Sequence, residues 1–435
     1  MNESDPINKN PKPPQIEKLN GLGLAAKQLC SLVYVSGFEP EKARSLYIDP
    51  VISPFGFDYT AEYDTAKRQV TVTHFGSWSA TAEMRDGLGC TLTTMLDSGS
   101  QLPVVELPVV QDKPLKRASS IDFANVCDRN TVDQALERAF TPEHNTLAVA
   151  VLHRGALVAE RYAAGIDAST VLPGWSMAKS LTATLVGLLV ERGSLDVYQP
   201  GIVPEWCGRL DGSDQVMLDH LLRMTSGLDV VEDQSGSDPN SHMLFVESDA
   251  AAFAASRGIN HTPGTHWEYM SGSTILACRA IYEAAGGTLE SSQRFYREAF
   301  MKPLGAPSFI LETDTAGTFI GSSYALATTH DWAKFGQLYL DDGIWEGERL
   351  LPEGWVEYVT RHTPESGANS YGAGFWTVEH SDLENLPLDT FYANGFQGQY
   401  VIVVPSRSLV VVRLGASLGP DGIWQLLEDL MSALH

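Results

Sequence analysis

The sequence has few basic residues and no long hydrophobic run. Its 435 residues include 30 Lys and Arg but 54 Asp and Glu, so the formal net charge is −24. This shortage of positive charge argues against a nucleic-acid binder, because phosphate contacts need clustered Lys and Arg. No stretch reaches the roughly 18 uninterrupted apolar residues that a membrane span needs. We therefore expect a globular protein with no nucleic-acid partner and no membrane span.

Cysteine is also scarce, and its spacing does not indicate a metal site. None of the five cysteines forms a Cys-x-x-Cys pair, and no Cys/His cluster has the spacing of zinc ligands, so we predict no metal. An odd number leaves at least one thiol free, and we expect buried, reduced thiols. A Cys30–Cys90 bridge is the alternative, and it would imply an oxidising compartment. The cysteines are Cys30, Cys90, Cys127, Cys207 and Cys278.

Several common enzyme motifs are missing. There is no Gly-x-Ser-x-Gly sequence, which argues against an α/β-hydrolase. There is no His-Glu-x-x-His and no Gly-x-x-x-x-Gly-Lys, which argues against a metalloprotease and a P-loop protein. Residues 21–26 match the loose dinucleotide-binding pattern Gly-x-Gly-x-x-Ala, but no strand precedes them. We therefore predict that the protein needs no cofactor.

The N-terminal quarter of the chain differs from the rest. Residues 1–16 are polar and Pro-rich, and they are predicted to form a flexible arm. They lack the apolar core of a secretion signal, which leaves a cytoplasmic location, or a periplasmic or secreted one if a leader was removed. Residues 17–120 are predicted to be an accessory region: a helix in 17–36, a small antiparallel sheet in 57–95 and a Pro-rich linker in 97–120.

The pattern from residue 121 to 435 indicates an α+β domain. Alternating apolar residues predict two β-hairpins, one near each end of this region. A mostly helical segment of about residues 195–340 lies between them. We therefore expect one antiparallel sheet flanked by helices, closed by both ends of the region, with the helical segment as an inserted lobe. The predicted strands are 147–152, 156–162, 400–404 and 409–414.

The strongest chemical signal is a Ser-x-x-Lys pattern, Ser176 to Lys179, at the start of an apolar helix predicted over 176–191. Residues three apart share one helix face, so the lysine amine can reach the serine hydroxyl. Burial and the positive end of the helix dipole disfavour the ammonium form, which leaves an amine that can act as a base. Such a base activates the hydroxyl as a nucleophile. The unpaired N–H groups of the first turn can support an oxyanion.

Ser-x-x-Lys alone is a weak pattern. The alternative is a serine that caps the helix and a lysine that extends to water. We favour the catalytic interpretation, because a lysine at this end of the helix opposes the dipole and the rest of the helix is uncharged.

Five stretches, the first of which contains Ser176 and Lys179, carry a resemblance to a known family: GWSMAKSLTATLVGLLV, HLLRMTSGLD, PGTHWEYMSGSTILA, FGQLYLDDGIWEGERLLPEGWV and NGFQGQYVIVVPSRSLVVV. The chain resembles the serine β-lactamase and penicillin-binding protein superfamily. Within it, the chain looks most like class C-like family VIII carboxylesterases and 6-aminohexanoate-dimer (nylon oligomer) hydrolases. The resemblance covers about residues 130–435 and implies a β-lactamase/transpeptidase-like fold. It does not include the accessory region, which we expect to pack on the catalytic domain.

The resemblance implies a catalytic role for Tyr269, because residues 268–271 match the family's Tyr-x-Asn motif. Tyr269 would share a proton with Lys179 and Ser176 and deliver it to the leaving group. The phenol pKa, ordinarily near 10, must be lowered for this role, or the proton must pass in concert. Ser271 replaces the family's Asn, and we expect it to contact the substrate. A tyrosine of the core is the alternative for Tyr269.

The family's third motif, Lys-Thr-Gly, corresponds to residues 393–399. Ala393 stands in place of the lysine, so the usual partner of a β-lactam carboxylate is missing. The resemblance implies that the N–H groups of Ser176 and Phe396 hold the oxyanion, with a register one or two residues further on as the alternative. Gly395 would let the substrate approach the strand closely, unless it only bends the strand. The expected substrate contacts are Trp175, Ser271, Trp376, Asn394, Gly395, Gln397 and Gly398.

These observations together predict a serine hydrolase that cleaves a small-molecule ester or amide through an acyl-enzyme. The first alternative, a β-lactamase or D-alanyl-D-alanine carboxypeptidase, is weakened by Ala393 and Ser271. The second is a non-catalytic binding or sensor module on the same fold. Core packing is an equal alternative for Trp175 and Trp376. The sequence leaves open whether the protein forms a homodimer.

Overall fold

The computed structural model describes residues 16–434, apart from 57, 75, 77, 97–101, 119–127, 234 and 384. The predicted arm, except for Ile16, lies outside the described residues. So do Cys127, both ends of the predicted linker and the boundary expected near residue 121. No helix in the described part of the chain is long and apolar enough to cross a membrane.

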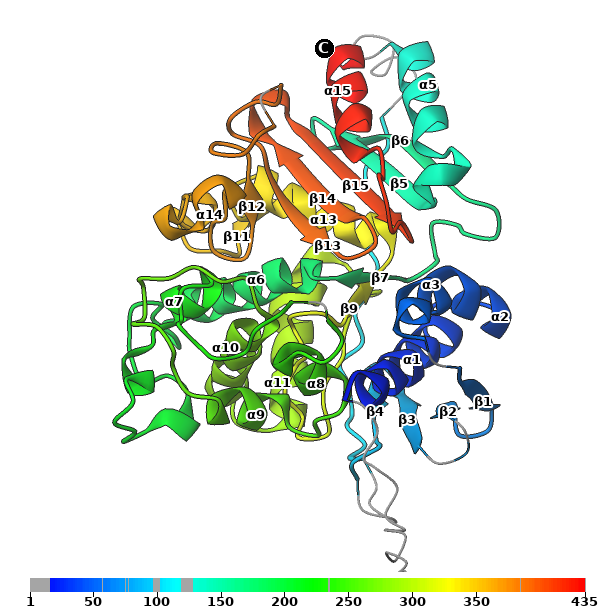
Figure 1. The fold of residues 1–435 in the computed structure, drawn as a ribbon. Helices are drawn as coiled ribbons and strands as arrows, with labels where there is room; N and C mark the ends of the chain where they lie inside the picture. Colours follow the sequence, from blue (N-terminus) through cyan, green and yellow to red (C-terminus); the bar gives the residue numbers. More distant parts are fainter. Residues whose placement is uncertain are drawn as a thin grey trace, which may run out of the picture.

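Six strands of the described chain form the large antiparallel sheet, in the order β12-β13-β14-β15-β5-β6. Both predicted hairpins, β5–β6 and β14–β15, are present. The pairing of β15 with β5 closes the sheet from the two ends of the domain, as predicted (Figure 1). The strands are β5 (Thr146–His153), β6 (Ala156–Tyr162), β12 (Trp376–Thr377), β13 (Phe391–Gly395), β14 (Gln399–Val404) and β15 (Leu409–Gly415).

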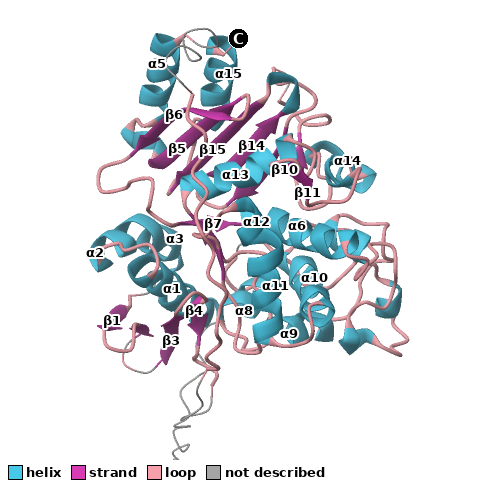
Figure 2. Cartoon of the chain, turned by 180° about the vertical axis from the view of Figure 1, so that it is seen from behind, coloured by secondary structure: helices cyan, strands magenta, loops and turns pink. Residues whose placement is uncertain are grey.

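Different helices cover the two faces of this sheet, because successive side chains of a strand point to opposite sides. Val149 belongs to the core under α5 (Arg129–Ala139) and α15 (Ile423–Ala433). Its neighbour Ala150 belongs to the larger core that includes α13 (Thr329–Leu340). Figures 1 and 2 show α5 and α15 together on one side of the sheet and α13 on the other.

The helical lobe lies between the two strand groups, as predicted, and the predicted long helix is α6 (Met177–Glu191). A small sheet in the order β7-β9-β8 was not predicted, because its strands of two to four residues are too short to show alternation. These strands are β7 (Leu172–Trp175), β8 (Ile310–Leu311) and β9 (Ala325–Ala327). The helices that follow α6 are α7 (Leu218–Leu222), α8 (Pro239–Phe245), α9 (Ala250–Ser256), α10 (Ser271–Ala284), α11 (Leu289–Phe295) and α12 (Lys302–Leu304). Past α13 come β10 (Ile344–Trp345), β11 (Glu348–Arg349) and α14 (Trp355–Thr360).

The accessory region consists of helices and a small antiparallel sheet, as predicted. Its longest helix, α1, packs on the sheet β1-β2-β3-β4. Figure 1 shows this region beside the helical lobe. Its elements are α1 (Ile16–Tyr34), α2 (Pro40–Ala43), α3 (Asp49–Ile52), β1 (Thr60–Asp64), β2 (Gln69–His74), β3 (Trp78–Arg85) and β4 (Gly89–Leu92).

The cysteines are free thiols wherever the structure describes them. Cys30 and Cys90 are both buried in the accessory region and are not bridged, so the disulfide alternative is wrong. The expectation of buried thiols holds for Cys278 but not for Cys207, which is exposed. Cys207 follows a short helical turn in which Trp206 takes the buried position.

Helix α1 docks closely on the rest of the molecule. A Cβ atom at Gly23 would lie 1.7 Å from the carbonyl oxygen of Phe245 in α8, so only glycine permits this approach. Lys27 forms a buried ion pair with Glu312. The same carboxylate accepts a hydrogen bond of 2.6 Å from the N–H of Cys90 in β4. One carboxylate therefore binds both the helix and the sheet of the accessory region.

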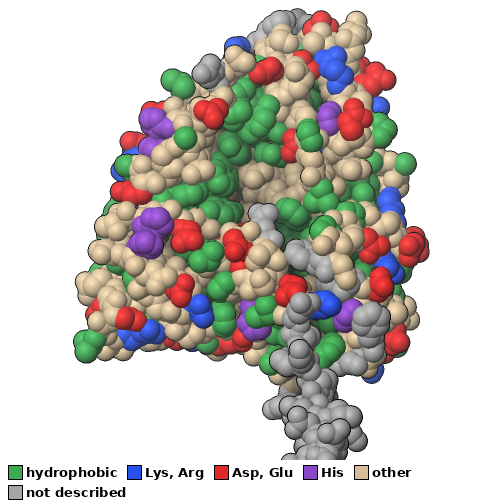
Figure 3. All heavy atoms as spheres, in the orientation of Figure 1, with side chains coloured by type: hydrophobic (Ala, Val, Ile, Leu, Met, Phe, Trp, Pro, Cys, Tyr) green, Lys and Arg blue, Asp and Glu red, His purple; other side chains and the backbone are tan. Residues whose placement is uncertain are grey.

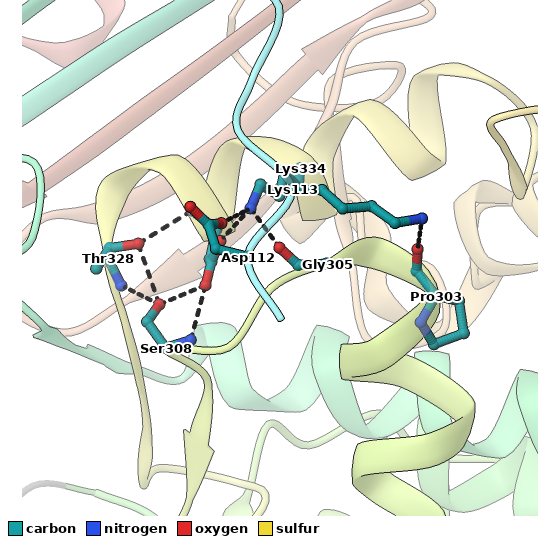
Figure 4. Close-up of polar contacts among 8 residues, drawn as sticks. Asp112, Lys113, Pro303, Gly305, Ser308, Thr328 and Lys334 are labelled. Atoms are coloured by element: carbon teal, nitrogen blue, oxygen red, sulfur yellow. Dashed lines mark hydrogen bonds and ion pairs between the residues drawn. The ribbon is translucent and has the colours of Figure 1, made fainter. Parts of the chain in front are cut away.

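The segment after residue 101 is tied to α13 (Figure 4). The side chain of Lys334 is buried, and its ammonium lies 2.8 Å from carboxylate oxygens of Asp331 and of Asp112. It also donates a hydrogen bond of 2.6 Å to the carbonyl oxygen of Gly305. Lys113, the next residue of the same segment, donates to the carbonyl oxygen of Pro303 at the surface.

We expect Lys334→Met to lower the free energy of unfolding by about 3–5 kcal/mol, because the buried Asp331 carboxylate would lose its cation. The matched control is Lys113→Met, which removes a half-exposed ammonium paired with Glu346. It should cost less than about 1 kcal/mol. Urea unfolding followed by circular dichroism compares the two variants. Equal losses would contradict this ranking.

Candidate active site

Ser176 stands where β7 ends and α6 begins, at a sharp turn of the backbone. The preceding residue, Trp175, has a φ of 48°, in the left-handed region that large side chains rarely adopt. The carbonyl oxygen of Ser176 accepts a hydrogen bond of 3.0 Å from the N–H of Lys179, which begins the helix. This strained turn places Ser176 on the lining of a cavity.

The amine of Lys179 lies beside the hydroxyl of Ser176. Its Nζ is 3.1 Å from Ser176 Oγ, 3.3 Å from Ser271 Oγ and 3.1 Å from the carbonyl oxygen of Ser322. The side chain of Lys179 is buried. Burial lowers the pKa of Lys179, and the negative charge of Glu232 partly opposes this. The three-residue spacing in the sequence predicted that the amine and the hydroxyl would meet in this way.

Three lysines of the described chain are buried, and they differ in their partners. Lys27 contacts Glu312, and Lys334 contacts Asp331. In the part of the chain that the structure describes, no carboxylate lies within ion-pair distance of Lys179. A buried ammonium with neutral neighbours is unfavourable, so this environment favours the neutral amine.

Tyr269 lies over the same amine. Lys179 Nζ is 4.7 Å from the centre of the Tyr269 ring. Burial raises the pKa of Tyr269 well above its ordinary value, the charge of Glu232 raises this pKa further, and a hydrogen bond with Ser176 opposes both. The phenol therefore stays protonated. A raised pKa does not fit the first route considered from the sequence, a lowered phenol pKa, and leaves passage of the proton in concert as the proposal.

Ser271 connects Lys179 to a carboxylate that sequence reasoning missed. The hydroxyl of Ser271 is 3.3 Å from Lys179 Nζ and donates a hydrogen bond of 3.0 Å to Glu232 Oε2. The N–H of Ser271 donates to the same carboxylate oxygen at 2.8 Å and to Asn240 Oδ1 at 3.0 Å. Ser271 is buried and lines the cavity. Glu232 is 39 residues away in an irregular segment, where no periodicity indicates a site.

Strand β13 passes very close to β7. A Cβ atom at Gly395 would lie 2.1 Å from the carbonyl oxygen of Gly174, so glycine is needed for contact between these two strands. The sequence had led us to expect the substrate, and not Gly174, in the space beside Gly395. Phe396 follows on the lining of the cavity, with its ring 5.4 Å from that of Trp175 in an edge-on arrangement. Asn394 also lines the cavity.

Besides Gly395, two more of the expected substrate contacts lie away from the cavity. Gln397 is buried, and its side-chain N–H donates a hydrogen bond of 3.3 Å to the carbonyl oxygen of Tyr47 in the accessory region. Gly398 lies against the guanidinium of Arg413, which donates a hydrogen bond to its carbonyl oxygen. The lining of the cavity includes neither residue. The turn after β13 thus directs Phe396 and Gln397 to different sides.

The cavity has a volume of about 720 Å³ and a largely hydrophobic lining. Figure 3 shows the surface hollowed on this face, with hydrophobic side chains along the rim. Trp376, an expected contact, lines the cavity with its ring 5.4 Å from that of Tyr269. Residues 21–26 belong to α1 and form no nucleotide-binding loop; Gly21 and three other residues of this helix line the cavity. The aromatic residues of the lining are Trp175, Phe245, Trp267, Tyr269, Trp376 and Phe396.

The charged side chains on the described lining are both acidic, Glu17 and Glu232. Ala393, in place of the family's lysine, is fully buried. A substrate carboxylate would therefore find no lysine or arginine among the lining residues of the described chain. Within that same part, no group of three His, Cys, Asp or Glu side chains could hold a metal ion.

Comparison with known proteins identifies relatives of the whole catalytic domain. A curated relative, the 6-aminohexanoate-dimer hydrolase of Paenarthrobacter ureafaciens, is 26% identical over 311 residues, which cover 67% of this chain and 76% of the relative. Two solved structures share the fold at 16% identity. A family VIII carboxylesterase has a TM-score of 0.56 over 71% of this chain and 98% of its own. A D-stereospecific amidohydrolase from Streptomyces sp. has a TM-score of 0.54 over 70% of this chain and 98% of its own.

The family match covers the catalytic domain and not the accessory region. It extends over residues 131–432, which is well over half of the chain and includes Ser176, Lys179 and Tyr269. The fold, with its antiparallel sheet and inserted helical lobe, agrees with the match. The chain belongs to the Beta-lactamase family.

Proposed function

We propose that this protein hydrolyses small-molecule esters or amides through an acyl-enzyme formed on Ser176, with Lys179 as the base. The observation that carries the proposal is the distance of 3.1 Å between Lys179 Nζ and Ser176 Oγ, in a place where the amine is buried without a carboxylate partner in the described chain. A neutral amine at that distance can accept the serine proton. The relatives named above are esterases and amide hydrolases, which supports the same reaction class.

The proposed reaction has two stages, formation of the acyl-enzyme and its hydrolysis. The Ser176 proton moves to Lys179 as Oγ attacks the substrate carbonyl carbon, and the N–H groups of Ser176 and Phe396 hold the oxyanion. The bond to the leaving group then breaks, and Tyr269 gives the leaving group its proton while Lys179 supplies one to the phenol. Water then attacks the acyl-enzyme and gives a proton to the Lys179–Tyr269 pair. The pair passes this proton to Ser176 Oγ as the acyl bond breaks and the acid leaves.

A β-lactamase or D-alanyl-D-alanine carboxypeptidase would use the same nucleophile, but its substrates carry a carboxylate. The described lining offers two carboxylates and no basic side chain to such a group. Ala393 cannot pair with it either. The charge of the cavity therefore favours substrates without a carboxylate. A sensor module remains the alternative of another class, and an acyl-enzyme that forms but does not turn over would support it.

Replacement of Ser176 by Ala should abolish ester hydrolysis and covalent labelling by a serine-directed phosphonate. The matched control is Ser180→Ala on the same helix, whose hydroxyl donates a hydrogen bond to the carbonyl oxygen of Gly374. That variant should still be labelled. Mass spectrometry of the intact protein measures the adduct. Undiminished labelling of the Ser176→Ala variant would place the nucleophile elsewhere.

In the variant Glu232→Gln, the acid limb of the pH profile of kcat/KM should move to lower pH. The carboxylate raises the pKa of Lys179, so its removal lowers this pKa and lets the amine lose its proton at a lower pH. We expect a shift of about one pH unit. The control is Asp233→Asn, an exposed neighbour that accepts a hydrogen bond from the N–H of Ser235. It should leave the limb in place, and an unmoved limb in Glu232→Gln would refute the coupling.

A cephalosporin such as nitrocefin should be hydrolysed much more slowly than an uncharged p-nitrophenyl ester. The reason is the missing cation for its carboxylate. Steady-state assays of both substrates at one pH give the ratio of kcat/KM values. A ratio that favours the cephalosporin in the wild-type protein would overturn the ester or amide assignment.

A further inference from the structure

One wall of the cavity comes from residues that precede the family match. The residues that α1 contributes follow Glu17 at intervals of three, four and seven positions, so all of them lie on one face of that helix. Figure 1 shows α1 and α3 beside β7 and α8, which also contribute to the cavity. The residues of this N-terminal wall are Glu17, Asn20, Gly21 and Leu24 in α1 and Pro50, Val51 and Ile52 in α3.

Hydrogen bonds and close packing hold the N-terminal wall in place. The side-chain amide of Asn20 donates a hydrogen bond of 2.8 Å to the carbonyl oxygen of Gly236, and its oxygen lies 3.2 Å from His242 Nδ1. The carbonyl oxygen of Tyr47, shortly before α3, accepts from Gln397. Together with the Lys27–Glu312 ion pair, these contacts fix the wall at both its helices.

Gly21 is an unfavourable residue for this position, because glycine destabilises the interior of a helix relative to alanine. Gly23, two residues later, has a packing reason, since its neighbour Phe245 leaves no room for a Cβ atom. Gly21 instead lines the cavity. Because Gly21 shares its helix face with Glu17 and Leu24, which also line the cavity, we expect a side chain at this position to project toward that space. The glycine therefore enlarges the cavity at the expense of helix stability.

We propose that Gly21 is a specificity-determining residue, and that the space beside it receives an extended hydrocarbon part of the ester or amide substrate. The inference rests on the proposed function. Leu24, Val51 and Ile52 give this space apolar walls, and a volume of about 720 Å³ exceeds what an acetyl-sized substrate fills. The N-terminal wall thus selects for substrate length, while the family core supplies the chemistry.

The test compares p-nitrophenyl acetate with p-nitrophenyl octanoate in Gly21→Ala and Gly21→Phe. The phenyl ring should raise KM for the octanoate roughly tenfold and leave KM and kcat for the acetate nearly unchanged. Gly21→Ala should give a smaller change in the same direction, with a melting temperature at or above that of the wild-type protein. The matched control is Lys18→Phe, which adds the same ring on α1 outside the cavity lining.

The outcomes separate this inference from the proposed function. If the wild-type protein hydrolyses neither these esters nor the matching p-nitroanilides, the proposed function fails. If it hydrolyses them and both Gly21 variants keep the wild-type ratio of KM values, the role of Gly21 is refuted. Equal losses for both esters in a Gly21→Phe protein that melts normally would also refute it, because the wall would then affect the reacting centre and not the substrate chain.

Discussion

The amine of Lys179 is surrounded by neutral oxygen atoms in the protein interior, and the proposed chemistry of the site depends on its staying uncharged. Two other buried lysines, Lys27 and Lys334, contact carboxylates directly. The carboxylate of Glu232 reaches Lys179 only through the hydroxyl of Ser271. Direct contact would hold the ammonium form, whereas complete isolation would weaken the amine as a base. The serine between them sets an intermediate affinity for the proton.

Distant parts of the chain hold this arrangement together. Lys179 contacts Ser271, which is 92 residues away, and the carbonyl oxygen of Ser322, which is 143 residues away. Gly395 allows β13 to lie against Gly174, beside the turn that carries Ser176. Precise placement of a hydroxyl and an amine thus comes from rigid, closely packed elements, which suits a site that must align reacting atoms before the reaction starts.

The sequence predicted the parts of the fold and site that depend on local spacing. The hairpins follow from alternation, and the meeting of Ser176 with Lys179 follows from one turn of a helix. It missed Glu232 and the α1 wall, because these reach the site only through contacts between segments far apart in the chain. It assigned Gly395 to the substrate, although a neighbouring strand takes that space. A glycine in a strand indicates that another group approaches the backbone closely, but the sequence does not identify that group.

The ion pair between Lys27 and Glu312 has a consequence for the order of folding. The two residues are 285 positions apart, so on the order of tens of seconds of translation separate them. During that time Lys27 lacks its carboxylate partner, although the sheet β1-β2-β3-β4 that packs on α1 has already been made. The accessory region is therefore made first, and its buried ion pair forms only after the segment around Glu312 arrives.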